Sequence, residues 1–537
     1  MLKKSKINLI FILLLAAILR FYQLGINPPA LYWDEASLGY NAFSILKFGI
    51  DEHGKSYPTT NFAAFGDYKP PLYIYLSTIP IAIFGLNEFS IRFASALFGS
   101  ITVFIAYCLA KKLFENDKTS LLTALLLAIS PWHVQLSRGA FEGNVGLFFS
   151  SLGILFFIKF AKDNPKYIFI SSLAFLSAMY TFTGQRLFVP VILPVLVITF
   201  ISEIKKNIKI IATALIISGI IFYPLFNFSV NTIEGMLRFE EVTIFKDLDP
   251  INKSTHYIEA DNNSFLSRLI HNRRFFFARE YLINYFDAFD PDFLFAHGDG
   301  NPRLSIRDIG ELYYFELPLI LAGTYLLIKN NQKYKFLIFS WLLISPLGPA
   351  TARETPHALR MVHILPTFQL IAAYGAYHFI VLNKYKRVFL VMSIPLILIS
   401  VFYYLHQYYS HYPKTYSGEW QYGYKQAVKV ANENYDSVNK IIVTQKLGRP
   451  YIYFLLFSQS NPKEYLKSSN IVIDNFFFYH VNSFDKYIFT DDIEKYANEP
   501  NAMYIVPSGK LPQGTKKIET IKDLGNYSVF DIGKSEI

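Results

Sequence analysis

The chain has few charged residues for its length. Only 17% of its 537 residues are Asp, Glu, Lys or Arg, while 52% are hydrophobic and 17% are aromatic. Soluble domains carry about 25% charged residues. This shortage of charge, together with several long apolar runs, indicates a protein that crosses a membrane many times.

Cysteine and metal-binding motifs are also scarce. Cys108 is the single cysteine, and because it lies in an apolar run we interpret it as a packing residue; no disulfide framework or cysteine metal site can form. His53, His271, His297 and His363 lack metal-ligand spacing. HExxH, Walker A and GxGxxG motifs are absent, so nothing supports hydrolysis of a cytosolic nucleotide.

The net charge of +10 is distributed in small basic clusters between the apolar runs. Basic clusters between apolar runs are typical of the loops that set the orientation of membrane helices. The positive charge therefore does not indicate a nucleic-acid partner. Lys3, Lys4 and Lys6 precede the first apolar run, at residues 7–21. Because no small-residue cleavage site follows, we expect an uncleaved first span and a cytoplasmic N-terminus.

The apolar run at residues 71–84 decides the rest of the topology. It has about fourteen residues, which is short for a transmembrane helix. If it spans, every later basic loop changes sides; if it lies in the interface or enters only partway, those loops all face the cytoplasm, as the positive-inside rule favours. The loops contain Lys111 and Lys112; Lys159, Lys162 and Lys166; Lys205, Lys206 and Lys209; Lys329, Lys333 and Lys335; and Lys384, Lys386 and Arg387.

We therefore expect an α-helical polytopic membrane protein with about eleven transmembrane helices. Residues 1–405 form the expected transmembrane domain. Its first extracytoplasmic loop, 25–90, carries interfacial helices, and a second large loop covers 229–311. The expected spans are 7–24, 91–112, 119–137, 143–160, 167–183, 187–204, 208–228, 312–328, 334–347, 361–381 and 387–405.

The tail, residues 406–537, changes character. It is polar and rich in Asn and Lys, with a helical pattern at 424–434 and short apolar runs at 440–444 (KIIVT) and 502–506 (AMYIV). Such runs are typical of strands, so we expect a small extracytoplasmic α/β domain.

Polar residues at the outward ends of spans are the first candidates for function, because polar groups at membrane depth are costly unless they are paired or wet. Asp34 and Glu35 follow Trp33 directly, although two acids could simply complement the positive end of a helix. Lys69 follows Asp67 and Tyr68 and precedes two prolines; its alternative role is to extend toward lipid headgroups.

Two further outward segments contain charged residues. The turn SRGAFEGNVG holds Arg138 and Glu142, which could instead form a structural pair four residues apart on a helix. The segment GPATARETPHALR holds His357 and Arg360 just before an apolar run. Basic residues are usually concentrated in cytoplasmic loops, so basic residues on the outward side indicate an anionic partner there, such as an inorganic or lipid phosphate.

At these residues the chain resembles the GT-C superfamily of polyprenyl-phosphate-sugar-dependent glycosyltransferases. The nearest branch contains the dolichyl-phosphate-mannose-protein mannosyltransferases and the lipid A aminoarabinose transferases. The resemblance covers the first 150 residues well and the middle of the chain sparsely. The matching segments are WDEA, GDYKPPLYIYL, FSIRFASALFG, SRGAFEGNVG and HALR.

The resemblance implies a GT-C fold with eleven spans and a site on the outer face. Asp34 matches the catalytic acid of the family, and Glu35 is its neighbour. Glu142 stands where some relatives carry an Asp near the acceptor or a metal, and we assign Asp67 and Tyr68 to the same vicinity. No cofactor is certain; a divalent metal is left open, and its identity is unknown. The positions that match donor-phosphate contacts are Lys69, Arg138, His357 and Arg360.

We thus expect an integral enzyme of the plasma membrane that moves a hexose or related sugar from a polyprenyl-phosphate donor to an extracytoplasmic protein, lipid or glycan. Asp34 is the expected general base, and direct displacement inverts the anomeric centre. The alternatives are a flippase or transporter of lipid-linked sugars and a non-catalytic glycolipid-binding protein. A transporter should show mid-span charges and internal repeats, and the sequence shows few such charges and no repeat.

Overall fold

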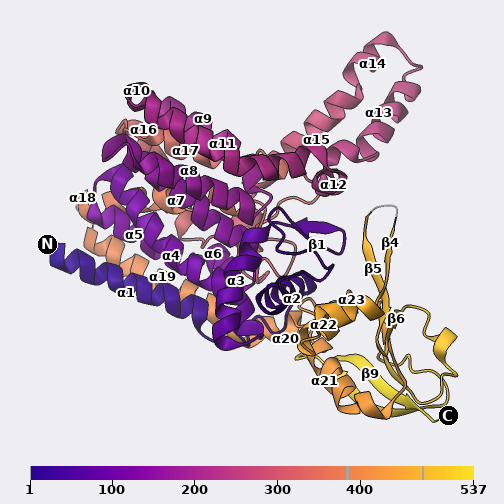
Figure 1. The fold of residues 1–537 in the computed structure, drawn as a ribbon. Coiled ribbons are helices and arrows are strands. Elements are labelled where there is room, and N and C mark those ends of the chain that lie inside the picture. Colours follow the sequence, from indigo (N-terminus) through magenta and orange to yellow (C-terminus); the bar gives the residue numbers. More distant parts are fainter. Residues whose placement is uncertain (1, 383–385, 475–476, 537) are drawn as a thin grey trace. The chain divides into compact units, whose positions relative to one another are not determined.

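The chain folds into two compact units in a computed structural model that describes residues 2–382, 386–474 and 477–536 (Figure 1). The first, here called the helical unit, comprises Met1–Arg20, Leu97–Ser137 and Glu142–Tyr404. The second, the mixed unit, comprises Phe21–Ala96, Arg138–Phe141 and Leu405–Ile537. The expected first extracytoplasmic loop and the tail, which were predicted to belong to different domains, therefore lie in one compact unit.

A helix lies at each of the eleven expected spans. The helices at these positions are α1 (Leu2–Phe21), α4 (Glu88–Phe114), α5 (Asp117–Ile129) with α6 (Pro131–Arg138), α7 (Glu142–Lys162), α8 (Tyr167–Thr181), α9 (Gln185–Thr199) with α10 (Ile201–Lys206), α11 (Ile208–Asn231), α16 (Glu316–Lys329), α17 (Lys335–Ile344), α18 (Thr367–Leu382) and α19 (Lys386–His406).

By length and composition, four helices in the described part of the chain can cross a membrane, or up to five if the bent pair α5 and α6 counts as one span. The count of eleven remains a prediction. On α11 and α19, large apolar side chains such as Ile220, Val391 and Phe402 are mostly exposed. Exposed apolar surface on this scale is typical of helices that face lipid.

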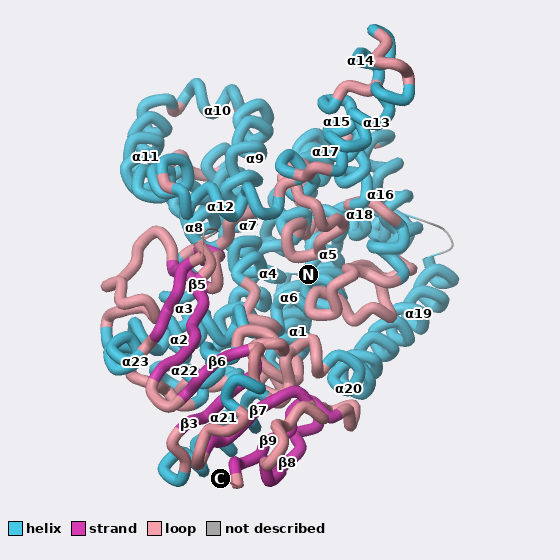
Figure 2. Tube along the Cα trace, turned by 90° about the vertical axis from the view of Figure 1, so that its right-hand side faces the viewer, coloured by secondary structure: helices cyan, strands magenta, loops and turns pink. Residues whose placement is uncertain are grey.

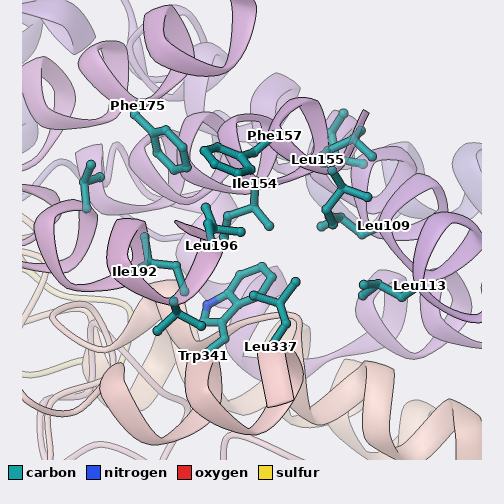
Figure 3. Close-up of a cluster of buried hydrophobic side chains, with 14 of the residues drawn as sticks. Leu109, Leu113, Ile154, Leu155, Phe157, Phe175, Ile192, Leu196, Leu337 and Trp341 are labelled. Carbon is teal, nitrogen blue, oxygen red and sulfur yellow. The ribbon is translucent and has the colours of Figure 1, made fainter. Parts of the chain in front are cut away.

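The core of the helical unit consists of close-packed apolar side chains (Figure 3). Leu109 from α4, Leu155 from α7 and Trp341 from α17 are almost completely buried there. The helices α16 and α18 pack even more closely, since a Cβ added at Gly323 would collide with the carbonyl oxygen of Ile371. Small residues allow this contact between backbones, which drives helix association where no hydrophobic effect operates.

The large loop at 229–311, for which the sequence indicated no elements, is mostly helical. Asn272 caps one of its helices by accepting a hydrogen bond from the backbone N–H of Arg274 at 2.9 Å, which satisfies one of the free donors at that end. The helices are α12 (Ile233–Val242), α13 (Asp249–Ala260), α14 (Phe265–Ile270) and α15 (Arg273–Asp287).

The mixed unit begins with the segment that was expected to form the first extracytoplasmic loop. It contains two helices, α2 (Trp33–Phe48) and α3 (Pro71–Phe84), and a hairpin of β1 (Phe62–Ala64) and β2 (Asp67–Lys69). Helix α2 ends at Gly49, whose φ of 73° is the left-handed conformation that glycine adopts readily at a helix end.

The tail contributes a mixed seven-stranded sheet in the order β4-β5-β6-β3-β7-β9-β8 (Figure 2). The central strand β3 runs parallel to both β6 and β7. The expected α/β tail is confirmed, including a helix at 424–434. The elements of the tail are α20 (Tyr412–Tyr416), α21 (Tyr424–Asn434), β3 (Lys440–Thr444), α22 (Pro450–Phe457), α23 (Pro462–Ser468), β4 (Asn470–Ile473), β5 (Tyr479–Phe484), β6 (Tyr487–Thr490), β7 (Ala502–Pro507), β8 (Thr515–Lys522) and β9 (Ser528–Ser535).

Candidate functional site

Asp34 lies in the first turn of α2 and forms an ion pair with Lys69 on β2. The Lys69 ammonium is 3.1 Å from Asp34 Oδ1 and 3.1 Å from Asp67 Oδ2. The side chain of Asp34 is 38% exposed, whereas that of Lys69 is only 13% exposed. A mostly buried ammonium thus fixes the orientation of a carboxylate that remains accessible to a ligand.

Glu35, the next residue, is buried in a second ion pair. Its Oε1 and Oε2 accept hydrogen bonds of 2.9 Å each from Nε and Nη2 of Arg92, a bidentate arrangement. Oε2 also accepts the backbone N–H of Tyr32 at 3.2 Å, and Oε1 accepts that of Ala140 at 2.7 Å. Both oxygens are engaged by these hydrogen bonds, which is typical of a carboxylate that holds the surrounding chain, and the expected catalytic role of Glu35 stays a prediction.

Arg92 extends this buried network. It donates to the carbonyl oxygens of Leu24 at 3.3 Å, Pro28 at 2.8 Å and Ala30, and its guanidinium lies 5.5 Å from the ring centroid of Trp420. The sequence analysis included Arg92 only as part of a matching segment. The signal that could have identified it is a charged residue within an apolar run, which requires a buried partner.

Arg138, one of the residues expected to contact the donor phosphate, is completely buried. Its Nη2 donates to the carbonyl oxygens of Tyr22 and Asn27 at 2.7 Å each, and its Nε donates to Tyr408 Oη at 2.9 Å. The guanidinium lies over the rings of Tyr408 and Tyr409. Because these groups surround it, Arg138 joins segments of the mixed unit, and its expected contact with a donor phosphate stays a prediction.

The three residues expected near the acceptor or a metal have different environments. Asp67 is part of the Lys69 ion pair, Tyr68 is buried, and Glu142 is the buried first residue of α7 in the helical unit. Within residues 2–382, 386–474 and 477–536, the structure shows no group of three or more His, Cys, Asp or Glu side chains placed to hold a metal ion.

In the helical unit, His357 and Arg360 lie in the turn before α18. Arg360 contacts Glu354 through Nη1 to the backbone carbonyl oxygen at 3.2 Å and Nη2 to the carboxylate at 3.6 Å. The buried Asp299 supports the turn, since its Oδ2 accepts the backbone N–H of Ala358 at 2.6 Å and lies 4.0 Å from His357 Nδ1. Burial raises the pKa of the Asp299 carboxyl, and hydrogen bonds from the backbone N–H groups of Asn301 and Ala358 partly oppose that rise.

These two residues line a groove of about 380 Å³ in the helical unit, here called the basic groove. A third basic residue, Arg186 in the first turn of α9, lies on the same groove and was not identified from the sequence. The walls are mainly apolar and contain Phe182, Leu187, Val242, Pro349 and Leu359. An apolar groove with two arginines and a histidine suits a ligand that joins a phosphate to a hydrocarbon chain.

Sequence reasoning also missed a buried polar network behind α2. The Glu52 carboxylate accepts hydrogen bonds from Ser37 Oγ at 3.1 Å, Asn41 Nδ2 at 2.8 Å and Tyr451 Oη at 3.2 Å. Burial raises its pKa from 4.5 to about 7, although the three hydrogen bonds oppose that rise. Because Tyr451 belongs to α22, the network joins the helix that carries Asp34 to the tail.

Comparison with known proteins supports the expected superfamily. Residues 68–226 match the family described as dolichyl-phosphate-mannose-protein mannosyltransferase, a segment that includes Lys69 but begins after Asp34. An uncharacterized protein of Aquifex aeolicus is 28% identical over 171 residues, 32% of each chain. The putative mannosyltransferase YycA of Bacillus subtilis is 24% identical over 208 residues, 38% of this chain and 29% of that relative. The matches thus span about a third of either relative.

Solved structures show the same fold over a greater length. ArnT from Cupriavidus metallidurans in the apo state has a TM-score of 0.56 at 11% identity, covering 98% of this chain and 97% of that one. The oligosaccharyltransferase AglB from Archaeoglobus fulgidus, in complex with an inhibitory peptide and a dolichol-phosphate, has a TM-score of 0.51 at 13% identity, covering 84% and 63%. The chain thus has the fold of these membrane glycosyltransferases, and residues 68–226 are similar to the mannosyltransferase family.

Proposed function

We propose that this chain is an integral-membrane glycosyltransferase that moves a hexose or related sugar from a polyprenyl-phosphate donor to an extracytoplasmic acceptor. The observation that carries the proposal is the partly exposed Asp34 carboxylate, fixed by the mostly buried Lys69. The structure of ArnT bound to undecaprenyl phosphate, with a TM-score of 0.54, supports a lipid-linked donor by analogy of fold. The N-terminus is cytoplasmic and the tail extracytoplasmic in this proposal.

Asp34 acts as the general base. The acceptor hydroxyl attacks the anomeric carbon of the donor sugar while Asp34 takes the hydroxyl proton, and the bond between that carbon and the phosphate oxygen breaks. The sugar is transferred with inversion, and polyprenyl phosphate leaves. Because a phosphate is a good leaving group, it needs neutralisation of its charge more than protonation. A positioned base of this kind contributes roughly 10²–10⁴-fold to the rate.

Glu35 has a different role, as a positioning residue. Its carboxylate holds Arg92 and the backbone at Tyr32 and Ala140 through hydrogen bonds. Since Glu35 and Asp34 belong to the same helical turn, the buried pair fixes the start of α2 and thereby the direction of Asp34.

The basic groove supports the donor assignment. Arg186 and Arg360 can each bind a phosphate oxygen pair in a bidentate manner, and the apolar walls can hold isoprenoid units. Glu354 orients Arg360 through the contacts described above. His357, placed by Asp299, completes the basic set. We assign the donor phosphate to these three residues of the helical unit, and the expected contact of Lys69 with that phosphate stays a prediction.

The test uses purified full-length protein in nanodiscs, supplied in turn with polyprenyl-phosphate mannose, glucose and aminoarabinose and with cell-envelope extract as acceptor. Mass spectrometry should detect sugar transfer from at least one donor by the wild type and its loss in Asp34→Asn. The exposed Asp492, in the tail, provides a matched control, and Asp492→Asn should behave as the wild type. Absence of transfer from every donor, or full activity of Asp34→Asn, would falsify the proposal.

A further inference from the structure

A second hollow lies in the mixed unit, at the end of the tail sheet, and no part of the mechanism above uses it. This crevice has a volume of about 570 Å³ and is here called the tail crevice. The residue Trp33, which directly precedes Asp34, forms part of its wall. The other lining residues used below are Lys446, Arg449, Tyr479, His480 and Asp491.

The position of the tail crevice follows from the strand order. The loop at 445–449 continues from the carboxyl end of β3, and Asp491 directly follows β6, the parallel neighbour of β3. From β3 the chain passes to the side of β6, and from β6 it returns to β7 on the other side of β3. Ligands of parallel sheets bind where the strand order reverses in this way, at the carboxyl ends of the strands.

The chemistry of the crevice favours an anion. In the part of the chain that the structure describes, neither Lys446 nor Arg449 has a carboxylate within ion-pair distance. The imidazole of His480 is paired with Asp474 at 3.0 Å. Asp491 is the one acidic residue of the lining, and it can accept a hydrogen bond from a hydroxyl group of the ligand.

The loop that carries both cations is held in place against Trp33. Gly448 has a φ of 121°, and a Cβ at this position would lie 2.9 Å from the Trp33 ring. The side chain of Gln421 also holds this loop, since its Nε2 donates to the Leu447 carbonyl oxygen at 3.0 Å. The close contact places the cationic loop beside an aromatic ring that is itself only half-buried. A sugar ring can pack on such an indole while its charged substituent meets the cations.

We propose that the tail crevice binds an anionic group, a phosphate or a carboxylate, carried by the sugar acceptor. This inference rests on the proposed transferase function, because Trp33 connects the crevice to the residue that we assign as the base. Lys446 and Arg449 bind the anion, and Trp33 packs against the ring next to it. The acceptor is therefore a charged glycan or glycolipid and not a neutral one.

Binding can be measured without turnover by calorimetry on the full-length protein in nanodiscs of zwitterionic lipid, with the basic groove saturated by polyprenyl phosphate. The probes are mannose 6-phosphate, glucuronate and, as a neutral control, mannose. At least one anionic probe should bind about tenfold or more tightly than mannose, and Lys446→Gln and Arg449→Gln should each weaken it about tenfold, as expected for a charge-assisted hydrogen bond. Preference for one anionic probe distinguishes a phosphorylated from an acidic acceptor.

Two control variants make the result specific. Lys463→Gln removes an exposed cation of the same domain outside the crevice, and Asp34→Asn removes the base; both should bind the anionic probe as the wild type does. Equal binding of all three probes, or binding that Lys446→Gln and Arg449→Gln leave unchanged, overturns the inference. If the wild type transfers no sugar but still binds the anion through these two cations, the proposed function fails while the anion site stands.

Discussion

Two ion pairs at the start of α2 show how different neighbouring carboxylates can be. Asp34 pairs with Lys69 and remains 38% exposed, whereas Glu35 pairs with Arg92 and is 3% exposed. Asp34 has one cationic partner, while Glu35 accepts hydrogen bonds from a guanidinium and two backbone N–H groups. The difference separates a carboxylate that can meet a substrate from one that holds the surrounding chain.

The same distinction applies to the arginines. Arg92 and Arg138 are fully buried and satisfied by carbonyl oxygens, a carboxylate and tyrosines. Arg186 and Arg360 instead line the basic groove. In the sequence all four arginines carry the same charge and could not be told apart. Their burial in the structure separates the two scaffold arginines from the two that line the groove.

The largest expected effect on stability is that of Arg92→Met. The substitution leaves Glu35 buried without its cation, which destabilises a protein by about 3–5 kcal/mol. Lys69→Met should cost less than about 1 kcal/mol, because the Asp34 carboxylate is partly solvated. Thermal unfolding in detergent, followed by tryptophan fluorescence, measures both. Equal destabilisation by the two variants would remove the distinction between the pairs.

Glu52 is a third carboxylate to compare with Asp34 and Glu35. It is buried, and among the described residues it forms no ion pair with a Lys or Arg side chain. Its pKa is raised to about 7, so the folded state holds the proton more tightly than the unfolded state. The resulting stabilisation is present below pH 4.5 and is lost as the pH rises toward 7. The shift corresponds to roughly 3 kcal/mol.

Glu52→Gln removes this titration. Between pH 5 and pH 8, the unfolding temperature of the wild type should therefore fall further than that of the variant. Unfolding curves recorded for both proteins at matched ionic strength measure the difference. Parallel pH dependences would show that Glu52 is not the group responsible.

The smallest of these effects is expected in the basic groove. Arg186→Gln and Arg360→Gln should each raise the KM for the polyprenyl-phosphate donor about tenfold, or about 1.4 kcal/mol, with little loss of stability. Arg353 is a suitable control because it belongs to the same loop but pairs with Asp247 at 3.7 Å and does not line the groove. If Arg353→Gln changes the KM as much as Arg360→Gln, the groove does not hold the donor phosphate.

Much of the architecture was accessible from hydropathy and local patterns. The helices at all eleven expected positions, the short helix at 71–84 and the strands KIIVT and AMYIV were predictable because their apolar periodicity is strong. The grouping of residues 21–96 with the tail was not, because it depends on contacts such as Tyr451 Oη to Glu52 between residues far apart in the sequence.

The site was only partly predictable. Asp34 with Lys69, and His357 with Arg360, could be selected as charged residues near the outward ends of spans. The buried roles of Glu35 and Arg138 could not, since the same residue types serve as scaffold or as ligand contact according to what surrounds them. Arg186 and Asp299 were missed because neither lies in a segment with a recognisable pattern.

The most direct test of the central claim is a single-turnover measurement on Asp34→Asn with donor already bound. We predict that the variant binds the polyprenyl-phosphate sugar with the affinity of the wild type and that its transfer step is at least about 100-fold slower, as expected for loss of a general base. Transfer at the wild-type rate from an equally occupied donor site would contradict the assignment of Asp34 as the base.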